Sequence, residues 1–130
     1  MSLLLDTCAI IWAAHDPERL SEKTLRRMVD PEETIFVSAI SVGELACLSI
    51  SKRLELNQHW KVWFRNAIEL NGWSVVPIDL EVIEEAYSLP EEFHTDPADR
   101  ILVATARLQR LEIVTGDRKI LNYPHVRSLA

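Results

Sequence analysis

Short apolar runs alternate with segments of helical periodicity along the chain. The runs at residues 2–5, 34–38, 73–78 and 112–115 predict four β-strands, and residues 126–129 predict a further edge strand. Between them, apolar side chains recur every three or four residues, as on one face of an amphipathic helix. Strands that alternate with helices predict an α/β fold, a three-layer α/β/α sandwich around a central, mainly parallel sheet of four or five strands.

Polar residues mark the starts of the predicted helices. Ser21, Ser41, Asp79 and Asp96 are the expected N-caps, and a proline follows Asp96 at the favoured first helical position. Ser41 precedes Glu44 by three residues, which is the spacing of a capping box. This spacing places Glu44 in the first turn of its helix.

Four acids are predicted to meet at one edge of the sheet. Asp6 and Asp117 directly follow strands, whereas Glu44 and Asp99 are expected in the first turns of helices. In a parallel α/β sheet, the carboxyl ends of the strands and the N-termini of the following helices share one edge. Each acid alone has a structural explanation in a cap, a helix dipole or a turn, but four gathered carboxylates repel one another. A hard cation with oxygen ligands relieves that repulsion, so the sequence predicts a Mg²⁺ or Mn²⁺ site.

Polar neighbours of these acids are further candidates. Thr7 and Thr115 are placed to orient a carboxylate or a coordinated water, and a cap or strand-end role is the alternative. Arg100 and Arg118 each follow an acid, which makes them candidates for holding a substrate phosphate or for surface ion pairs. His94 is the only histidine near a candidate acid in sequence, and we interpret it as a loop residue, with a catalytic or substrate role as the alternative.

Length and composition limit the class of protein. The 130 residues fit one domain, 1–130, and 48% hydrophobic with 26% charged residues is typical of a globular chain. The net charge of −6 argues against a protein held on nucleic acid by bulk charge, so a polyanionic substrate requires metal or local arginine and lysine. Cys8 and Cys47 lie in apolar helical patterns and are expected to be small buried side chains. With no basic leader and no apolar run long enough to span a membrane, a cytoplasmic protein is expected.

Four motifs carry a resemblance to a known family. They are Leu-Leu-Asp-Thr at 4–7, Ser-Val-Gly-Glu at 41–44, Val-Thr-Gly-Asp at 114–117 and, most specifically, the long segment 93–106. Through them the chain resembles the PIN-domain family, in particular the VapC-type toxins, over essentially its whole length. By this resemblance, the family's four acids correspond to Asp6, Glu44, Asp99 and Asp117. Its accessory acid corresponds to Asp96, and its associated hydroxyl corresponds to that of Thr115.

The resemblance implies a Mg²⁺- or Mn²⁺-dependent ribonuclease that hydrolyses phosphodiester bonds. In that reading Asp6 and Asp99 are the principal metal ligands. Glu44 and Asp117 are supporting ligands, or hold a second ion or the attacking water. The resemblance also implies RNA as substrate, a small antitoxin protein as partner, and a homodimer.

Three other classes of protein are alternatives on the residues alone. A receiver domain that accepts a phosphoryl group needs adjacent acids after an early strand and a lysine ending a late one, and neither pattern is clear here. A dehalogenase-type phosphatase needs a second acid two residues after Asp6, where Cys8 stands. A metal-binding but catalytically silent partner of a regulatory protein stays open, because sequence reveals ligands and not turnover.

Overall fold

A computed structural model describes residues 2–130 and contains every predicted strand. The elements follow in the order β1 (Ser2–Leu5), α1 (Thr7–His15), a 3-10 turn η1 (Pro17–Arg19), α2 (Glu22–Val29), β2 (Thr34–Ser38), α3 (Ala39–Ile50), α4 (Trp60–Asn71), β3 (Ser74–Val76), α5 (Leu80–Ala86), α6 (Pro97–Gln109), β4 (Glu112–Val114), α7 (Arg118–Leu121) and β5 (Ser128–Leu129). The strand at β3 is shorter than predicted, and it ends before Pro77, which has no backbone N–H to donate to a sheet.

The five strands form one parallel sheet in the order β3-β2-β1-β4-β5. The central strand β1 pairs through Leu5 with Val37 of β2 and with Val114 of β4. Its three leucines are fully buried, as expected for a strand covered by helices on both faces. The predicted three-layer α/β/α architecture is confirmed.

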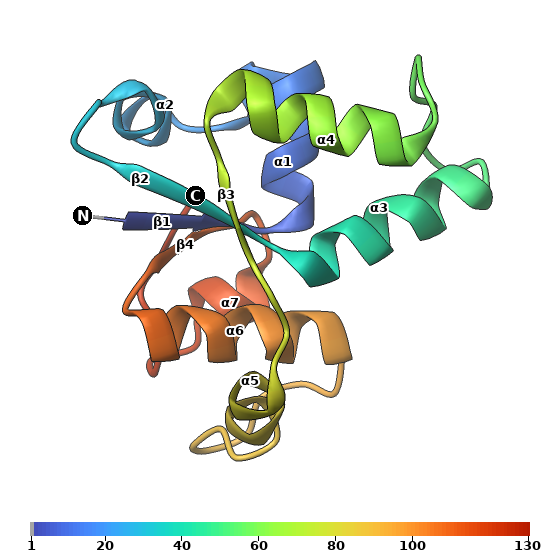
Figure 1. Cartoon of the computed structure of the whole chain (residues 1–130). Helices are drawn as coiled ribbons and strands as arrows, with labels where there is room; N and C mark the ends of the chain where they lie inside the picture. The colour runs from blue at the N-terminus through green and yellow to red at the C-terminus, as the bar shows by residue number, and fades with distance from the viewer. Residues whose placement is uncertain (1) are drawn as a thin grey trace.

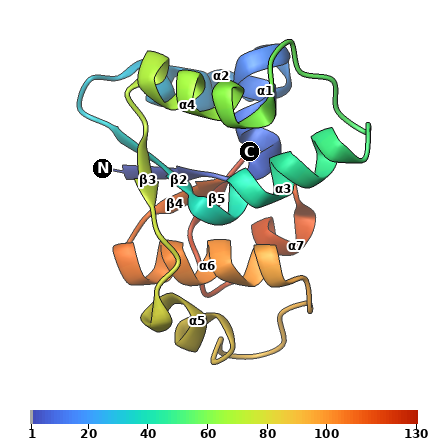
Figure 2. The same ribbon diagram turned by 45° about the vertical axis from the view of Figure 1, so that its right-hand side comes forward.

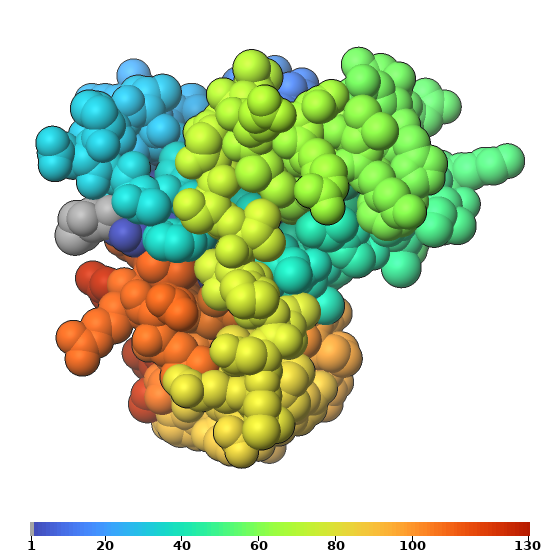
Figure 3. Space-filling model, in the orientation of Figure 1, coloured from blue at the N-terminus to red at the C-terminus, as the bar shows by residue number. Residues whose placement is uncertain are grey.

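Helices cover both faces of the sheet (Figure 1). The view in Figure 2 separates α1, α2 and α4 on one side from α5, α6 and α7 on the other. Trp63 and Phe64 of α4 pack into the core of the first side, and Leu102 and Val103 of α6 pack into that of the second. Figure 3 shows the chain from α4 through β3 to α5 crossing the outer surface, where the edge strand leaves Val75 45% exposed.

The start of α3 differs from the prediction. Ser38, the last residue of β2, is the N-cap, because its side chain accepts a hydrogen bond from the backbone N–H of Ile40. Helix α3 therefore begins at Ala39, three residues before the expected start. Ser41 is buried inside the helix, and Glu44 lies in the second turn and not in a capping box.

The other predicted N-caps are confirmed. The side chains of Ser21, Asp79 and Asp96 each accept a backbone hydrogen bond at the start of α2, α5 and α6. No helix within residues 2–130 has both the length and the apolar character needed to cross a membrane.

Candidate functional site

A cavity of about 810 Å³ opens at the carboxyl edge of the sheet. Strands β1, β2 and β4 end there, and α1, α3, α6 and α7 begin there. All of the predicted acids line the cavity: Asp6, Glu44, Asp96, Asp99 and Asp117. The structure thus brings together the four-acid cluster and its accessory acid. Another cavity, of about 680 Å³, lies at the opposite end of α6 and has none of these acids in its lining.

Asp6 is the most deeply buried of these acids, with 6% of its surface exposed. It caps α1, because its Oδ1 accepts the backbone N–H of Ala9 at 2.8 Å, and its Oδ2 accepts the hydroxyl of Thr115. Burial raises the pKa of Asp6 from 3.8 to about 6. These two hydrogen bonds oppose the rise, whereas the charges of Glu44 and Asp117 add to it. Asp6 is therefore fixed in orientation but costly to ionise.

Asp99 has the most strongly raised pKa of these acids. Burial is the largest cause that raises its pKa from 3.8 to about 7, and the nearby charges of Asp96, Asp117 and Glu44 contribute to this rise. Nε2 of His94 lies 3.0 Å from Oδ2 of Asp99, yet it is buried and makes no hydrogen bond among the described residues. Ligand atoms of His94, Asp99 and Asp117 all lie within 4.8 Å of one another. This grouping is compact enough to surround one ion.

Glu44 is held by α1 and α3 together. The hydroxyl of Thr7 donates to Oε1 of Glu44 and lies 3.0 Å from Oγ of Ser41. Burial raises the pKa of Glu44, the hydrogen bond from Thr7 opposes that rise, and the charge of Asp96 adds to it. The predicted role of Thr7 in orienting a carboxylate thus has a geometric basis, as does that of Thr115.

Asp117 and Asp96 are both N-caps. Asp117 caps α7 through the backbone N–H of Lys119 at 2.8 Å, and its own N–H donates to Oγ1 of Thr115 at 3.0 Å. Asp96 caps α6 through the N–H of Asp99 at 3.1 Å and is more exposed. Each acid therefore has a structural use as well as a place at the cavity.

The two arginines proposed for substrate phosphate do not line this cavity. The guanidinium of Arg100 donates to the backbone carbonyls of Ala86 and Phe93 and lies over the ring of Tyr87 at 5.5 Å. Arg100 thus ties α6 to α5 and the loop after it. Arg118 is exposed at the start of α7.

For four residues at or near the cavity, the structure corrects or sharpens what the sequence predicts. Cys8 and Cys47 are exposed at the cavity, so the expectation that they are buried is wrong. A signal existed for Cys47, which follows Glu44 by three residues and so shares its helix face. His94 reaches Asp99 from an irregular loop, where no periodic pattern predicts the direction in which a side chain points. Arg53, beyond the end of α3, also lines the cavity.

Comparison with known proteins agrees with this geometry. The family model for the PIN domain matches residues 3–126. The chain belongs to the PIN-domain family. Ribonuclease VapC22 of Mycobacterium tuberculosis is 32% identical over 126 residues, covering 97% of this chain and 95% of that protein. The VapC-type resemblance is confirmed, which sets aside the receiver and phosphatase alternatives.

Solved structures share the fold of this PIN-domain protein. VapBC2 from Rickettsia felis bound to a promoter DNA fragment has a chain with a TM-score of 0.73 and 17% identity, covering 99% of this chain and 98% of that one. A toxin–antitoxin complex from Klebsiella pneumoniae gives a TM-score of 0.67 and 22% identity, with coverages of 98% and 96%. At these identities the likeness establishes the fold alone.

Proposed function

We propose that this protein is a metal-dependent ribonuclease that hydrolyses RNA phosphodiester bonds and acts as the toxin of a toxin–antitoxin pair. The observation that carries the proposal is the cavity in which Asp6, Glu44, Asp99 and Asp117 meet, in a chain of the PIN-domain family. The similarity to a protein named as a ribonuclease supports the activity.

The residues at the cavity fit a divalent cation. Asp6, Glu44 and Asp99 all have raised pKa values, which is the expected state of desolvated carboxylates that lack a positive partner. The buried Nε2 of His94 lies 3.0 Å from Oδ2 of Asp99 and makes no hydrogen bond among residues 2–130. A set rich in carboxylate oxygens suits Mg²⁺ or Mn²⁺, and a single imidazole favours Mn²⁺ of the two.

We assign Asp6 and Asp99 as principal ligands and Glu44 and Asp117 as supporting ligands. When bound, the cation neutralises charge on the scissile phosphate and makes a water molecule easier to deprotonate. The chain supplies orientation, since the Thr115 hydroxyl and the N-terminus of α1 fix both oxygens of Asp6.

An alternative role for Glu44, held by Thr7, is to accept a proton from the attacking water. Burial raises the pKa of Glu44 toward neutral pH, and a general base works best when its pKa is near the operating pH.

Partners follow from the same relatives. Among the solved structures with this fold, one is a toxin–antitoxin complex and others are VapBC structures. We infer that a small antitoxin protein binds this chain and that the chain forms a homodimer. Co-expression with the neighbouring open reading frame, followed by size-exclusion chromatography with light scattering, tests both inferences.

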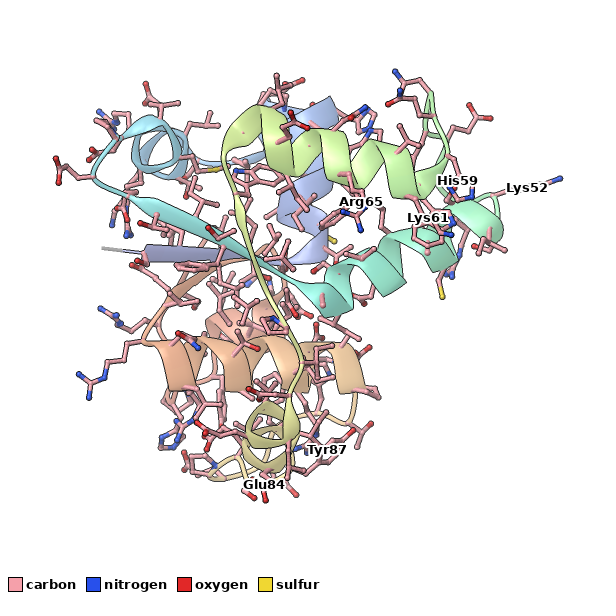
Figure 4. The ribbon with its side chains drawn as sticks, in the orientation of Figure 1. Lys52, His59, Lys61, Arg65, Glu84 and Tyr87 are labelled. Carbon is pink, nitrogen blue, oxygen red and sulfur yellow. The ribbon has the colours of Figure 1, made fainter. Side chains whose placement is uncertain are left out.

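Cleavage of a mixed RNA pool tests the proposed activity. Wild type and Asp99→Asn are compared with Mg²⁺, with Mn²⁺ and with chelator. We expect metal-dependent cutting that Asp99→Asn loses, while Glu84→Gln, an equal change of charge on the exposed face of α5, cuts like wild type (Figure 4). Metal binding without cutting in any condition would instead support the silent-partner function.

A further inference from the structure

The cavity lined by the five acids also has a basic residue in its wall. Among its described lining residues, Arg53 alone has a positively charged side chain. An RNA phosphate that enters the cavity meets five carboxylates, in a chain of net charge −6. In a chain of this net charge, a polyanionic substrate needs a metal ion or a local basic side chain to bind. Arg53 supplies such a side chain at the cavity.

The end of α3 determines where Arg53 lies. The N–H of Lys52 donates to the carbonyl of Ser49 at 3.1 Å, and the N–H of Arg53 donates to that of Leu48 at 2.9 Å. This pair of bonds is a Schellman motif, which reverses the chain at the helix C-terminus. The reversal brings Arg53 back beside Leu48, which also lines the cavity.

The reversal occurs without a glycine. Lys52 occupies the left-handed position with φ of 61°, where glycine is the usual residue because a Cβ adds steric cost there. Strained backbone of this kind concentrates at functional sites. The strain at Lys52 and the place of Arg53 at the cavity are two separate observations about the same turn.

The guanidinium of Arg53 has donors to spare. Its Nε donates to Oγ of Ser51 at 3.0 Å, and neither terminal nitrogen donates to an acceptor among residues 2–130. No described carboxylate forms an ion pair with it, although five line the same cavity. Two free terminal nitrogens in one plane match two oxygens of a phosphate.

We propose that Arg53 binds a backbone phosphate of RNA at the acid cavity and positions the chain for cleavage. The proposal rests on the proposed ribonuclease function and names a binding residue for it. The surrounding segment 52–65 carries four cationic side chains against one acid, Glu55. Figure 4 shows Lys52, Lys61 and Arg65 along this part of the molecule, far from Glu84 on α5.

RNA affinity without turnover tests the proposal. Fluorescence anisotropy of a labelled mixed-sequence RNA oligonucleotide is measured in chelator at low salt, with Asp99→Asn as the parent. Adding Arg53→Ala should weaken binding about tenfold or more, as expected for one lost charge-assisted contact. The slope of the logarithm of affinity against the logarithm of salt concentration should also fall in magnitude by about one, the value for one lost phosphate contact. Arg53→Lys should recover only part of the affinity, because an ammonium lacks the planar fork.

Arg65→Ala is the matched control. Arg65 is an exposed cation on α4 that does not line the cavity, so its removal should weaken binding less than threefold. Equal losses for Arg53→Ala and Arg65→Ala would overturn the proposal in favour of bulk charge. An unchanged affinity of Arg53→Ala, or no measurable binding by the parent, would overturn it as well.

Steady-state kinetics separates this proposal from the activity. If Arg53 acts as proposed, Arg53→Ala with Asp99 intact should raise KM more than it lowers kcat. Wild-type cutting that Asp99→Asn abolishes and Arg53→Ala leaves unchanged would refute the role of Arg53 and keep the ribonuclease. If wild type cuts no RNA, the anisotropy result still decides whether Arg53 binds phosphate. Melting temperatures of Arg53→Ala, Arg53→Lys and Arg65→Ala within about one degree of that of their own parent establish that the fold is intact.

Discussion

Single side chains decide how closely the walls of the acid cavity approach each other. Gly116 lies between Thr115 and Asp117, and a Cβ built on it would stand 2.5 Å from Cη2 of Trp12. The Trp12 ring also carries the guanidinium of Arg19 at 4.7 Å and packs against the core, so it has little freedom to move. Gly116 is thus required by a close approach and not by a special φ angle.

Substitution of Gly116 should therefore displace Trp12. We expect Gly116→Ala to lower the free energy of unfolding by about 1–3 kcal/mol, the usual cost of overpacking, and to reduce RNA cleavage. Gly43→Ala is the control, because Gly43 lines the same cavity inside α3 and a Cβ there meets nothing within 4 Å. It should stabilise the helix by up to about 1 kcal/mol. Urea unfolding of both variants checks the two signs, and equal effects would contradict the steric explanation.

The raised pKa of Asp99 predicts a pH dependence for the metal-free protein. The native state holds a proton on Asp99 up to about pH 7, whereas the unfolded chain releases it near 3.8. The native state thus binds more protons between these values, so its stability falls as pH rises from about 4 to 7. Asparagine cannot ionise, so the advantage of Asp99→Asn over wild type should grow by a few kcal/mol across this window and level off above it.

Chemical unfolding in chelator at pH 5 and pH 7.5 measures this difference. Glu84→Gln, which removes an exposed acid, should show no such growth. A constant difference between Asp99→Asn and wild type at the two pH values would show that Asp99 ionises freely in the native state.

The positions of the acids could be predicted from the sequence, whereas those of the arginines could not. An acid after a buried strand has to emerge at the carboxyl edge, so Asp6 and Asp117 follow from strand order alone. Arg100 is predicted to hold a substrate phosphate because it follows Asp99 in the sequence. Adjacent helical residues point about 100° apart, and the guanidinium of Arg100 binds the carbonyls of Ala86 and Phe93 and not the cavity. His94 lies in a loop whose path depends on contacts with Phe93 and Tyr123 that no local pattern encodes.

Among the elements, α3 shows where local signals conflict. Ser38 and Ser41 are both plausible caps, and the capping-box spacing to Glu44 favoured the later one. The structure uses Ser38 both as the last residue of β2, paired with Val76, and as the cap of α3. A strand that passes into a helix without a loop leaves no turn residues to mark the boundary, so sequence placed it three residues too late.

The two serines should respond differently to substitution. Ser38→Ala removes the cap and should cost about 1 kcal/mol in unfolding free energy measured in chelator. Ser41→Ala leaves the helix start intact but removes a neighbour of the Thr7 hydroxyl that holds Glu44. It should therefore cost less stability in chelator and weaken Mn²⁺ affinity more. The reverse order of stability losses would restore Ser41 as the cap.

In the molecule as a whole, the acid cluster lowers stability, and the packing of the rest of the fold offsets that cost. Leucines of β1 and the apolar side chains of α4 and α6 bury the cores on both faces of the sheet. These contacts hold the carboxyl edge in place although its carboxylates are desolvated and repel one another. Strand order and helix periodicity were enough to predict this arrangement, because the core fills both faces of a parallel sheet with few alternatives.

A cation that binds only the native state should relieve the repulsion and raise stability. At a free Mn²⁺ concentration of 100 times its dissociation constant, the gain is about 2.7 kcal/mol, or roughly 10 °C in melting temperature for a chain of this size. Asp99→Asn removes a principal ligand and should lose most of this shift, while Glu84→Gln should keep it. Differential scanning fluorimetry across a Mn²⁺ titration measures all three proteins. A wild-type melting temperature that does not move would mean that the carboxylates keep their protons and hold no ion, because any cation bound to the native state must stabilise it.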